Sequence, residues 1–292
     1  MAMAAELQEA YRHCQRVARN EARNFYFAFI TLPGAKRRAI YAAYAFARLC
    51  DDIADGEAPV QDKIEQLAGV RRSLADAYAG APQGPVFVAL AHAANTYGIP
   101  QEYFDNLVSG VEVDTTKSRY ATFEELREYC YGVASTVGLI CGEIFGYKDP
   151  VAREYAVDLG LAMQLTNILR DIHEDAEQGR VYLPQDEMAR FGYSEAELLR
   201  GIINAQFIAL MRFQTERARA YYAQGAKLAA LVPVRSRACV AALQGLYTRL
   251  LDRIEANGFD VFRGRIRLPS HEKLLLTAKL WATSVLPISS KR

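Results

Sequence analysis

Apolar residues recur along this chain at helical spacing, and the polar breaks between them are short. We find no runs of alternating β-branched residues bounded by tight turns, which would indicate strands. Two capping boxes, Thr122 with Glu125 and Ser194 with Glu197, mark helix starts. The clearest breaks are AGAPQGP at 79–85, GIPQEY around Pro100, GYKDP at 146–150 and LVPVR at 231–235. The pattern predicts a single all-α domain over residues 1–292, with about ten helices.

One apolar helical segment, YAFARLCDDIAD at 44–55, ends in a group of carboxylates. Asp51 and Asp55 lie one turn apart on the same helix face. Like charges at this spacing destabilise a helix by a few tenths of a kcal/mol. The segment is therefore either a solvated helix end or a place where a cation binds.

A second segment, LAMQLTNILRDIHEDAEQGRVYLP at 161–184, repeats this design. Asn167, Asp171 and Asp175 recur at i, i+4 and i+8, so they form a line along one helix face, and Gln164 lies near that line. The residues before them are apolar. Two such helix ends facing each other would form an oxygen-lined rim above an apolar interior.

The chemistry of these side chains favours a hard divalent ion. Carboxylate and amide oxygens, without suitably spaced His or Cys, suit Mg²⁺, with Mn²⁺ as the alternative. Mg²⁺ usually takes one or two carboxylates and completes its shell with water and substrate phosphates. Arg48, Arg170 and Arg180 lie near the acidic residues in sequence and could bind the remaining oxygens of a diphosphate. The adjoining apolar helices imply a substrate with a long apolar part.

Composition excludes several other classes of protein. Lys and Arg number 35 against 34 Asp and Glu, without a basic run, so we expect no nucleic-acid partner. Five scattered cysteines without a CxxC pair indicate reduced thiols and a cytoplasmic protein. No uninterrupted apolar stretch reaches the ~18 residues of a membrane span.

Two other classes of helical protein are alternatives to a metal-dependent enzyme. A carboxylate-bridged di-iron bundle needs Glu-x-x-His pairs, and no Glu stands three residues before any of the four histidines. A non-catalytic helical module that binds a lipid or a partner would explain the apolar helices, but it gives no reason for the doubled carboxylates.

Together these motifs resemble the head-to-head prenyl synthases, the family of squalene, dehydrosqualene and phytoene synthases. The resemblance covers nearly the whole chain. It implies an isoprenoid-synthase-type helical bundle around a central apolar cavity, and a reaction that joins two identical isoprenoid diphosphates at their C1 ends. The segments that carry it are RNFYFAFITLP at 23–33, YAFARLCDDIAD at 44–55, YCYGVASTVG at 129–138, QLTNILRDIHEDAEQGRVYLP at 164–184 and GFDVFRGRIRL at 258–268.

The resemblance also implies roles for individual residues. The metal ions would be held by Asp51, Asp55, Asn167, Asp171 and Asp175. The diphosphates would be bound by Arg23, Asn24, Arg48, Arg170, Arg180 and Tyr182. Cations formed in the reaction would face Phe25, Phe29, Tyr44, Tyr129 and Tyr247, and Tyr129 is the aromatic residue expected nearest the reacting carbons. The cavity wall would include Val133, Ala134, Val137 and Gln164, with Gly160 relieving crowding opposite this wall.

The identity of the product depends on finer wording. RNFYFAF, GLICGEIFGY and RGRIRL look most like bacterial hopanoid-associated enzymes, which make presqualene diphosphate from two farnesyl diphosphates. The alternative is a phytoene synthase that uses two geranylgeranyl diphosphates. The sequence leaves NADPH use open, because the absence of GxGxxG decides little for this family. Because the product would be strongly apolar, we expect the protein to contact the inner face of a membrane peripherally when it releases the product.

Overall fold

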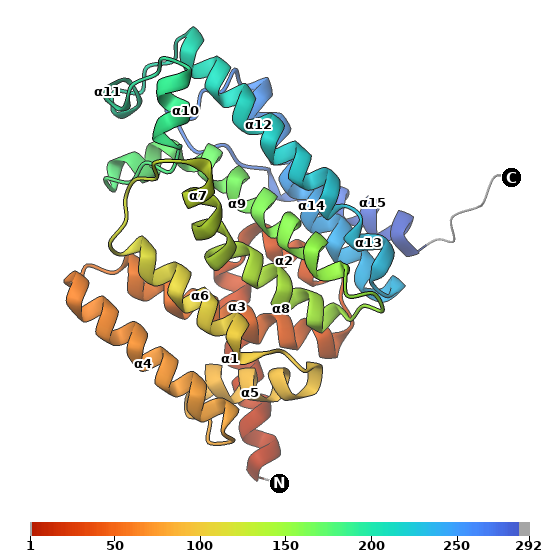
Figure 1. The fold of residues 1–292 in the computed structure, drawn as a ribbon. Helices are drawn as coiled ribbons and strands as arrows, with labels where there is room; N and C mark the ends of the chain where they lie inside the picture. The colour runs from red at the N-terminus through yellow and green to blue at the C-terminus, as the bar shows by residue number, and fades with distance from the viewer. Residues whose placement is uncertain (1, 286–292) are drawn as a thin grey trace, which may run out of the picture.

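The computed structural model describes residues 2–285, and their regular structure is helical, which confirms the predicted all-α class (Figure 1). A lone β-bridge between Arg119 and Val181 is the exception among these residues. The helices are α1 (Ala2–Glu21), α2 (Arg23–Phe29), α3 (Gly34–Asp55), α4 (Val60–Tyr78), α5 (Gly84–Tyr97), α6 (Gln101–Asp114), α7 (Phe123–Cys130), the π-helix η1 (Tyr131–Ser135), α8 (Thr136–Phe145), α9 (Ala152–Glu177), α10 (Gln185–Arg190), α11 (Glu195–Leu199), α12 (Ala205–Gly225), α13 (Leu228–Leu231), α14 (Val234–Ala256) and α15 (Ser270–Val285).

The described residues form more helices than the ten or so predicted, because several are short. The capping box at Ser194 and Glu197 is present and begins α11. At Thr122 only half of the box forms: its side chain accepts from the Glu125 backbone N–H, while the Glu125 carboxylate binds the Ala121 N–H. Both sequence signals therefore mark the start of a helix, including the short helix α11.

Helix α9 lies in the middle of the bundle and packs against α8, η1, α12 and α14 (Figure 1). Gly160 permits the close approach to η1, since a Cβ at this position would lie 2.6 Å from the Ala134 carbonyl oxygen. This confirms the predicted reason for a glycine there. On the other side of η1, a Cβ on Gly110 would lie 2.7 Å from the Gly132 carbonyl carbon. The chain after Tyr129 is thus held tightly between α6 and α9.

The π-helix η1 lies between α7, which begins after Thr122, and α8. Single π turns of this kind often occur at functional sites. From Val133 within the π-helix, Val137, Cys141 and Phe145 of α8 follow at intervals of four and line the same cavity. The segment from η1 through α8 therefore forms one wall of that cavity.

Two loops that carry candidate site residues are tied together by backbone hydrogen bonds. Val181 N–H donates to Ser118 O at 2.9 Å, and Gln185 N–H donates to Tyr120 O at 2.9 Å. These bonds join the loop after α6 to the loop after α9. As a result, the chain around Arg180 and Tyr182 is held against the end of α6.

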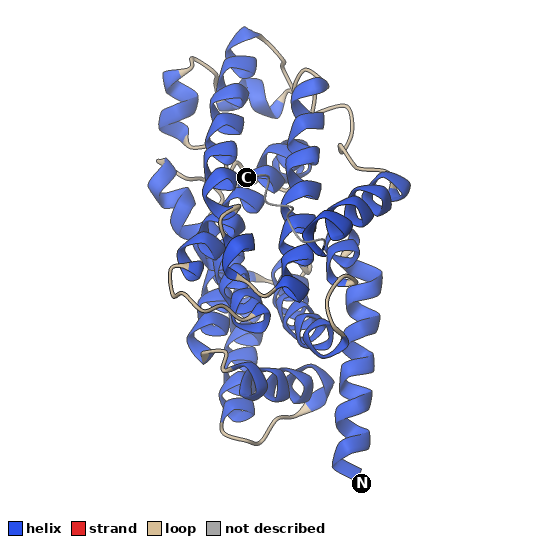
Figure 2. Ribbon diagram, turned by 90° about the vertical axis from the view of Figure 1, so that its right-hand side faces the viewer, coloured by secondary structure: helices blue, strands red, loops and turns tan. Residues whose placement is uncertain are grey.

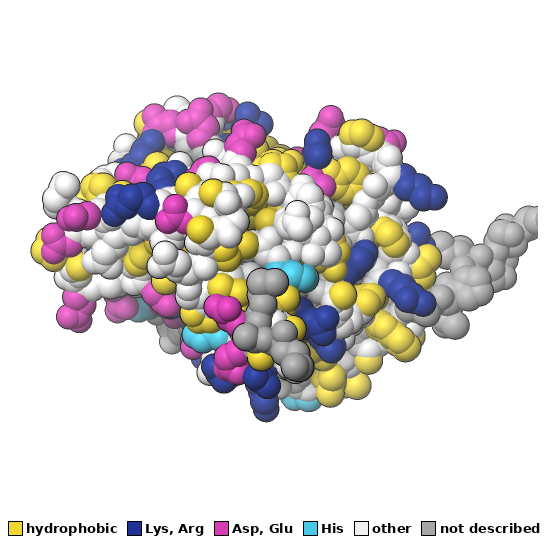
Figure 3. All heavy atoms as spheres, turned by 90° about the horizontal axis from the view of Figure 1, so that it is seen from below, with side chains coloured by type: hydrophobic (Ala, Val, Ile, Leu, Met, Phe, Trp, Pro, Cys, Tyr) yellow, Lys and Arg dark blue, Asp and Glu magenta, His cyan; other side chains and the backbone are white. Residues whose placement is uncertain are grey.

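Buried side chains from Ala10 to Val261 form a continuous hydrophobic cluster through the bundle. Figure 2 shows the elongated bundle from the side, with the N-terminus at its lower end. On the face in Figure 3, acidic and basic side chains lie interspersed with apolar ones and no large patch of one sign stands out. Among residues 2–285, no helix combines the length and apolar character needed to cross a membrane.

Candidate active site

Two adjoining cavities lie between α3, η1 and α9. One is mostly apolar, with a volume of about 240 Å³. The other is polar, with a volume of about 320 Å³. Asp51, Val133, Gln164 and Asn167 line both. The two acidic helix ends, which are far apart in sequence, thus meet above an apolar interior, in the arrangement that their spacing suggested.

Carboxylates from both helix ends crowd the polar cavity. Burial, with the nearby Asp55 carboxylate as the next cause, raises the pKa of Asp51 to about 7. Burial and the neighbouring Asp171 likewise raise the pKa of Asp175 to about 7. Like charges held together in a partly desolvated site favour protonation unless a cation neutralises them. The polar cavity is therefore electrostatically suited to bind cations.

Two arginines contact the Asp171 carboxylate. Arg170 donates from Nε to Asp171 Oδ1 at 2.6 Å, and its Nη2 contacts Oδ2. Arg265, from the loop between α14 and α15, donates to the same Oδ2 at 2.9 Å. Both Asp171 oxygens thus accept from guanidinium groups, and an ion at Asp171 would share or displace these contacts.

Asn167 provides the clearest sign of a missing partner. Its Oδ1 is buried and lacks a hydrogen-bond partner among the described residues, while its Nδ2 donates to Gln164 Oε1 at 3.3 Å. Buried polar atoms are nearly always satisfied, so this oxygen is suited to a metal ion or a ligand donor. Residues 2–285 hold no group of three or more His, Cys, Asp or Glu placed to bind an ion alone. The carboxylate and amide oxygens that line the polar cavity are of the kind that suit Mg²⁺.

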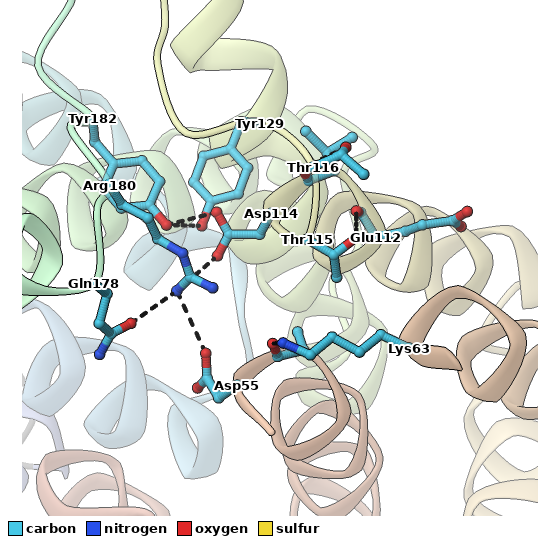
Figure 4. A network of polar contacts seen from close by, with 12 residues as sticks. Asp55, Lys63, Glu112, Asp114, Thr115, Thr116, Tyr129, Gln178, Arg180 and Tyr182 are labelled. Atoms are coloured by element: carbon cyan, nitrogen blue, oxygen red, sulfur yellow. Dashed lines mark hydrogen bonds and ion pairs between the residues drawn. The ribbon is translucent and has the colours of Figure 1, made fainter. Parts of the chain in front are cut away.

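Arg180, Tyr182 and Asp114 form a polar network at the rim (Figure 4). The Tyr182 hydroxyl donates to Asp114 Oδ1 at 2.6 Å. Arg180 Nη1 lies 3.5 Å from Asp55 Oδ1 and 3.6 Å from Asp114 Oδ2. Asp114 could not be recognised from its spacing in the sequence, because no second acidic residue lies one helical turn away from it.

Aromatic side chains lie beside both cavities. Tyr129 lines the polar cavity, stacks on Tyr182 with ring centroids 5.3 Å apart, and its hydroxyl lies 3.5 Å from that of Tyr182. Phe25, Phe29 and Tyr44 line the apolar cavity together with Val133 and Val137. Tyr247 is buried against Phe25, 5.6 Å between centroids, behind the lining residues. The rings that line the cavities could stabilise a carbocation through their faces. Tyr247 lines neither cavity, so the structure does not place it where the sequence analysis expected it to face the cation.

Among the described residues expected to bind diphosphate, Arg48 is not brought to the polar cavity. Arg48 pairs with Asp52 and lines a separate polar pocket of about 420 Å³ with His13 and Arg16. The side chains of Arg23 and Asn24 lie outside the described part of the structure. Arg170 and Arg180 do line the polar cavity, and Arg265 approaches it through Asp171. The GFDVFRGRIRL motif contains Arg265, but spacing alone gives no reason to place it beside α9.

The sequence model described as squalene/phytoene synthase matches residues 18–272. A 15-cis-phytoene synthase of Synechococcus elongatus is 39% identical, over 96% of this chain and 95% of its own length. A phytoene synthase of Mycobacterium tuberculosis is 40% identical, over 96% of this chain and 93% of its own.

Solved structures with the same fold include a dehydrosqualene synthase in complex with a ligand. It has a TM-score of 0.89 and 29% identity, covering 96% of this chain and 98% of that one. The squalene synthase HpnC from Alicyclobacillus acidocaldarius has a TM-score of 0.83 and 28% identity, covering 89% of this chain and 99% of that one.

Proposed function

The chain belongs to the squalene/phytoene synthase family and is a prenyltransferase, and on this premise we propose that it joins two farnesyl diphosphates head to head to give presqualene diphosphate. We further propose that residues 1–292 act as one catalytic domain. The continuity of the buried cluster from Ala10 to Val261 supports this second proposal.

The observation that carries the proposal is the boundary shared by the two cavities. Asp51, Val133, Gln164 and Asn167 line both the polar and the apolar cavity. A diphosphate in the polar cavity and a prenyl chain in the apolar one would place the C1–O bond at this boundary. The C1–O bond that breaks would then lie beside the residues proposed to bind the metal ions and the diphosphate.

In this proposal Asp51, Asp55, Asn167, Asp171 and Asp175 hold the metal ions, and Arg170 and Arg180 bind diphosphate oxygens. When bound there, Mg²⁺ or Mn²⁺ would supply positive charge that neutralises the departing diphosphate. The enclosed apolar cavity excludes water from the allylic cation, and the faces of Phe25 and Tyr44 stabilise it.

The second half of this proposed step forms the carbon–carbon bonds. The C2–C3 double bond of the other farnesyl diphosphate attacks C1 of the cation, and loss of a proton closes a cyclopropane. Two farnesyl diphosphates thus give one presqualene diphosphate, one pyrophosphate and one proton. Tyr129 lines the polar cavity, and we propose that it is the aromatic residue closest to the reacting carbons.

The length of the apolar cavity is compatible with either a farnesyl or a geranylgeranyl chain. Its lining runs along one helix face from Val133 to Phe145, which is about 18 Å of helix. An extended carbon chain advances roughly 1.25 Å per bond, so a farnesyl chain needs ~14 Å and a geranylgeranyl chain ~19 Å. Phe145 would then form the floor. The two structural neighbours named above are a dehydrosqualene synthase and a squalene synthase, and this supports C30 chemistry.

A phytoene synthase is the second candidate, and a specific observation favours it. The relatives from Synechococcus elongatus and Mycobacterium tuberculosis are named phytoene synthases and are 39% and 40% identical to this chain. These identities exceed those to the two structures named above. In this case the same site would join two geranylgeranyl diphosphates.

We propose a cytoplasmic protein that meets the inner face of a membrane when it releases its product. Helix α15 supports this, because Leu274, Leu275 and Trp281 are exposed large apolar residues on it. Exposed apolar and Trp side chains on a surface helix favour insertion at the membrane interface. NADPH is not needed for the step proposed here, and its use in a later step is tested by product analysis below.

Pyrophosphate release tests the proposal directly. With Mg²⁺ and farnesyl diphosphate we expect one pyrophosphate per two substrates consumed, and two if the enzyme continues to a hydrocarbon. Asp51→Asn and Asp171→Asn should each abolish release, while Asp62→Asn, on α4 and away from both cavities, should leave it unchanged. Unchanged release by both active-site variants would contradict the proposed function.

A further inference from the structure

Asp114 is the last residue of α6, and it lies in the polar cavity between the two acidic motifs. Its side chain is only 14% exposed. Burial raises its pKa, while the hydrogen bond from Tyr182 and the charge of Arg180 oppose that rise. Its charge is also among the causes of the raised pKa of Asp51 and of Asp175. Asp114 is therefore coupled to both acidic helix ends.

A carboxylate at this position is unfavourable for α6 itself. The C-terminus of a helix carries partial negative charge and repels anions. A residue chosen only to end the helix would be neutral or basic. The interactions that offset this cost are those with Tyr182 and Arg180, which both lie on the loop after α9.

Arg180 has three oxygen partners in the structure, and Figure 4 shows its guanidinium between them. Gln178 Oε1 lies at 3.2 Å, Asp55 Oδ1 at 3.5 Å and Asp114 Oδ2 at 3.6 Å. Asp55 is 54% exposed and is a proposed metal-binding residue, so its contact with Arg180 would be lost when an ion binds. Asp114 is the more buried carboxylate, and its oxygens already have protein partners.

Building on the proposed function, we infer that Asp114 is a positioning residue that holds Arg180 and Tyr182 at the rim of the polar cavity. In this role it keeps the guanidinium from pairing fully with Asp55, so that Asp55 stays available to the metal ion. It also fixes the Tyr182 phenol, on which Tyr129 stacks. Without the charge of Asp114, Arg180 would turn to the nearest remaining carboxylate and compete with the ion.

The test measures binding, not turnover. Inorganic pyrophosphate is titrated by calorimetry into the full chain, with and without MgCl₂. Asp114→Asn keeps an acceptor for Tyr182 and removes the charge that faces Arg180. We expect its Mg²⁺-dependent affinity for pyrophosphate to fall about tenfold, the usual scale for residues that support a metal site. Asp105→Asn, a similarly half-buried acid on the same helix, is the matched control and should bind as the wild type does.

A double-variant comparison separates positioning from a merely structural role. If Asp114 acts through Arg180, Asp114→Asn should cause little further loss of affinity in an Arg180→Gln background. Asp114→Glu, which restores the charge, should recover part of the affinity. Wild-type affinity in Asp114→Asn, losses that multiply in the double variant, or no recovery in Asp114→Glu would each overturn the inference. If Asp114→Asn does not fold, the recovery test is replaced by comparing Asp114→Glu with the wild type, and a loss above tenfold there contradicts it.

The binding experiment distinguishes a failure of the proposed function from a failure of the role assigned to Asp114. If the wild-type protein does not bind pyrophosphate with Mg²⁺, the proposed function itself is wrong. If the wild type binds and Asp114→Asn binds equally well, only the role of Asp114 is wrong.

Discussion

Asp51 on α3 and Asn167 on α9 come from segments far apart in the chain, yet both line the polar cavity and the apolar cavity. One brings a carboxylate whose pKa is raised to about 7, and the other a buried amide oxygen without a partner among the described residues. Neither arrangement favours the folded state by itself. Both are explained if the boundary between the cavities binds a cation and a diphosphate.

Asn167→Leu should separate activity from stability. Because the Asn167 Oδ1 is buried and unsatisfied, replacing the amide by an apolar group of similar shape removes a desolvation cost of about 1–3 kcal/mol, which offsets the loss of the hydrogen bond from Nδ2 to Gln164. We expect the melting temperature to stay the same or rise, while pyrophosphate release falls at least ~10-fold through loss of a metal-site residue. Thermal melts and release assays check this. A clear loss of stability would mean that the side chain serves the fold.

The pH dependence of stability should reveal the raised pKa values of Asp51 and Asp175. Without metal, Asp51 and Asp175 have a folded-state pKa of about 7, against 3.8 ordinarily. Between these values the native protein holds more protons than the unfolded chain, so their contribution to stability falls as pH rises from about 4 to 7. Thermal melts in EDTA should show a steeper loss over this range in wild type than in Asp51→Asn/Asp175→Asn. Parallel curves for the two proteins would count against the raised pKa values.

Removing the side chain at the proposed floor should lengthen the apolar cavity and change which substrate is accepted. Phe145→Ala removes the ring at the end of the apolar cavity and should raise the kcat/KM ratio of geranylgeranyl over farnesyl diphosphate about tenfold, since a few methylene groups in an apolar pocket are worth 1–3 kcal/mol. Phe87→Ala, a buried ring packed on Phe46 outside the cavity, is the control for a general loss of packing. An unchanged ratio in Phe145→Ala would show that Phe145 does not limit chain length.

Gly160→Ala tests the close packing that shapes the cavity wall. The added Cβ would lie 2.6 Å from the Ala134 carbonyl oxygen, so α9 and η1 must separate, at a cost of about 1–3 kcal/mol. Gly69→Ala is the matched control, because its added Cβ meets only an ordinary contact at 3.6 Å. In α4 this change should stabilise the helix by roughly 0.5–1 kcal/mol. Denaturant unfolding of both variants measures the difference, and equal stabilities would contradict the packing argument.

The sequence predicted the parts of this site that follow from local periodicity. Asp51 with Asp55, and Asn167 with Asp171 and Asp175, could be recognised because i, i+4 spacing aligns them on a helix face whatever the tertiary structure. That the two faces meet could only be inferred from their similar design, and the shared lining of the polar cavity bears this out.

The residues that sequence reasoning missed depend on loops and helix ends. Asp114 reaches the site because the loop after α6 is tied to the loop after α9, and Arg265 because the α14–α15 loop returns to α9. Arg48 shows the opposite case: its position near Asp51 in sequence suggested the polar cavity, but its side chain pairs with Asp52 in a neighbouring pocket. Sequence proximity does not determine the direction of a long side chain at a helix end.

Product analysis by mass spectrometry tests the central claim most directly. The protein is incubated with Mg²⁺ and either farnesyl or geranylgeranyl diphosphate, with and without NADPH. The account predicts a C30 cyclopropyl diphosphate from farnesyl diphosphate, unchanged by NADPH. Squalene that forms only with NADPH would mean that one protein carries out both steps. Phytoene from geranylgeranyl diphosphate, with no product from farnesyl diphosphate, would contradict the proposed substrate while leaving the site intact.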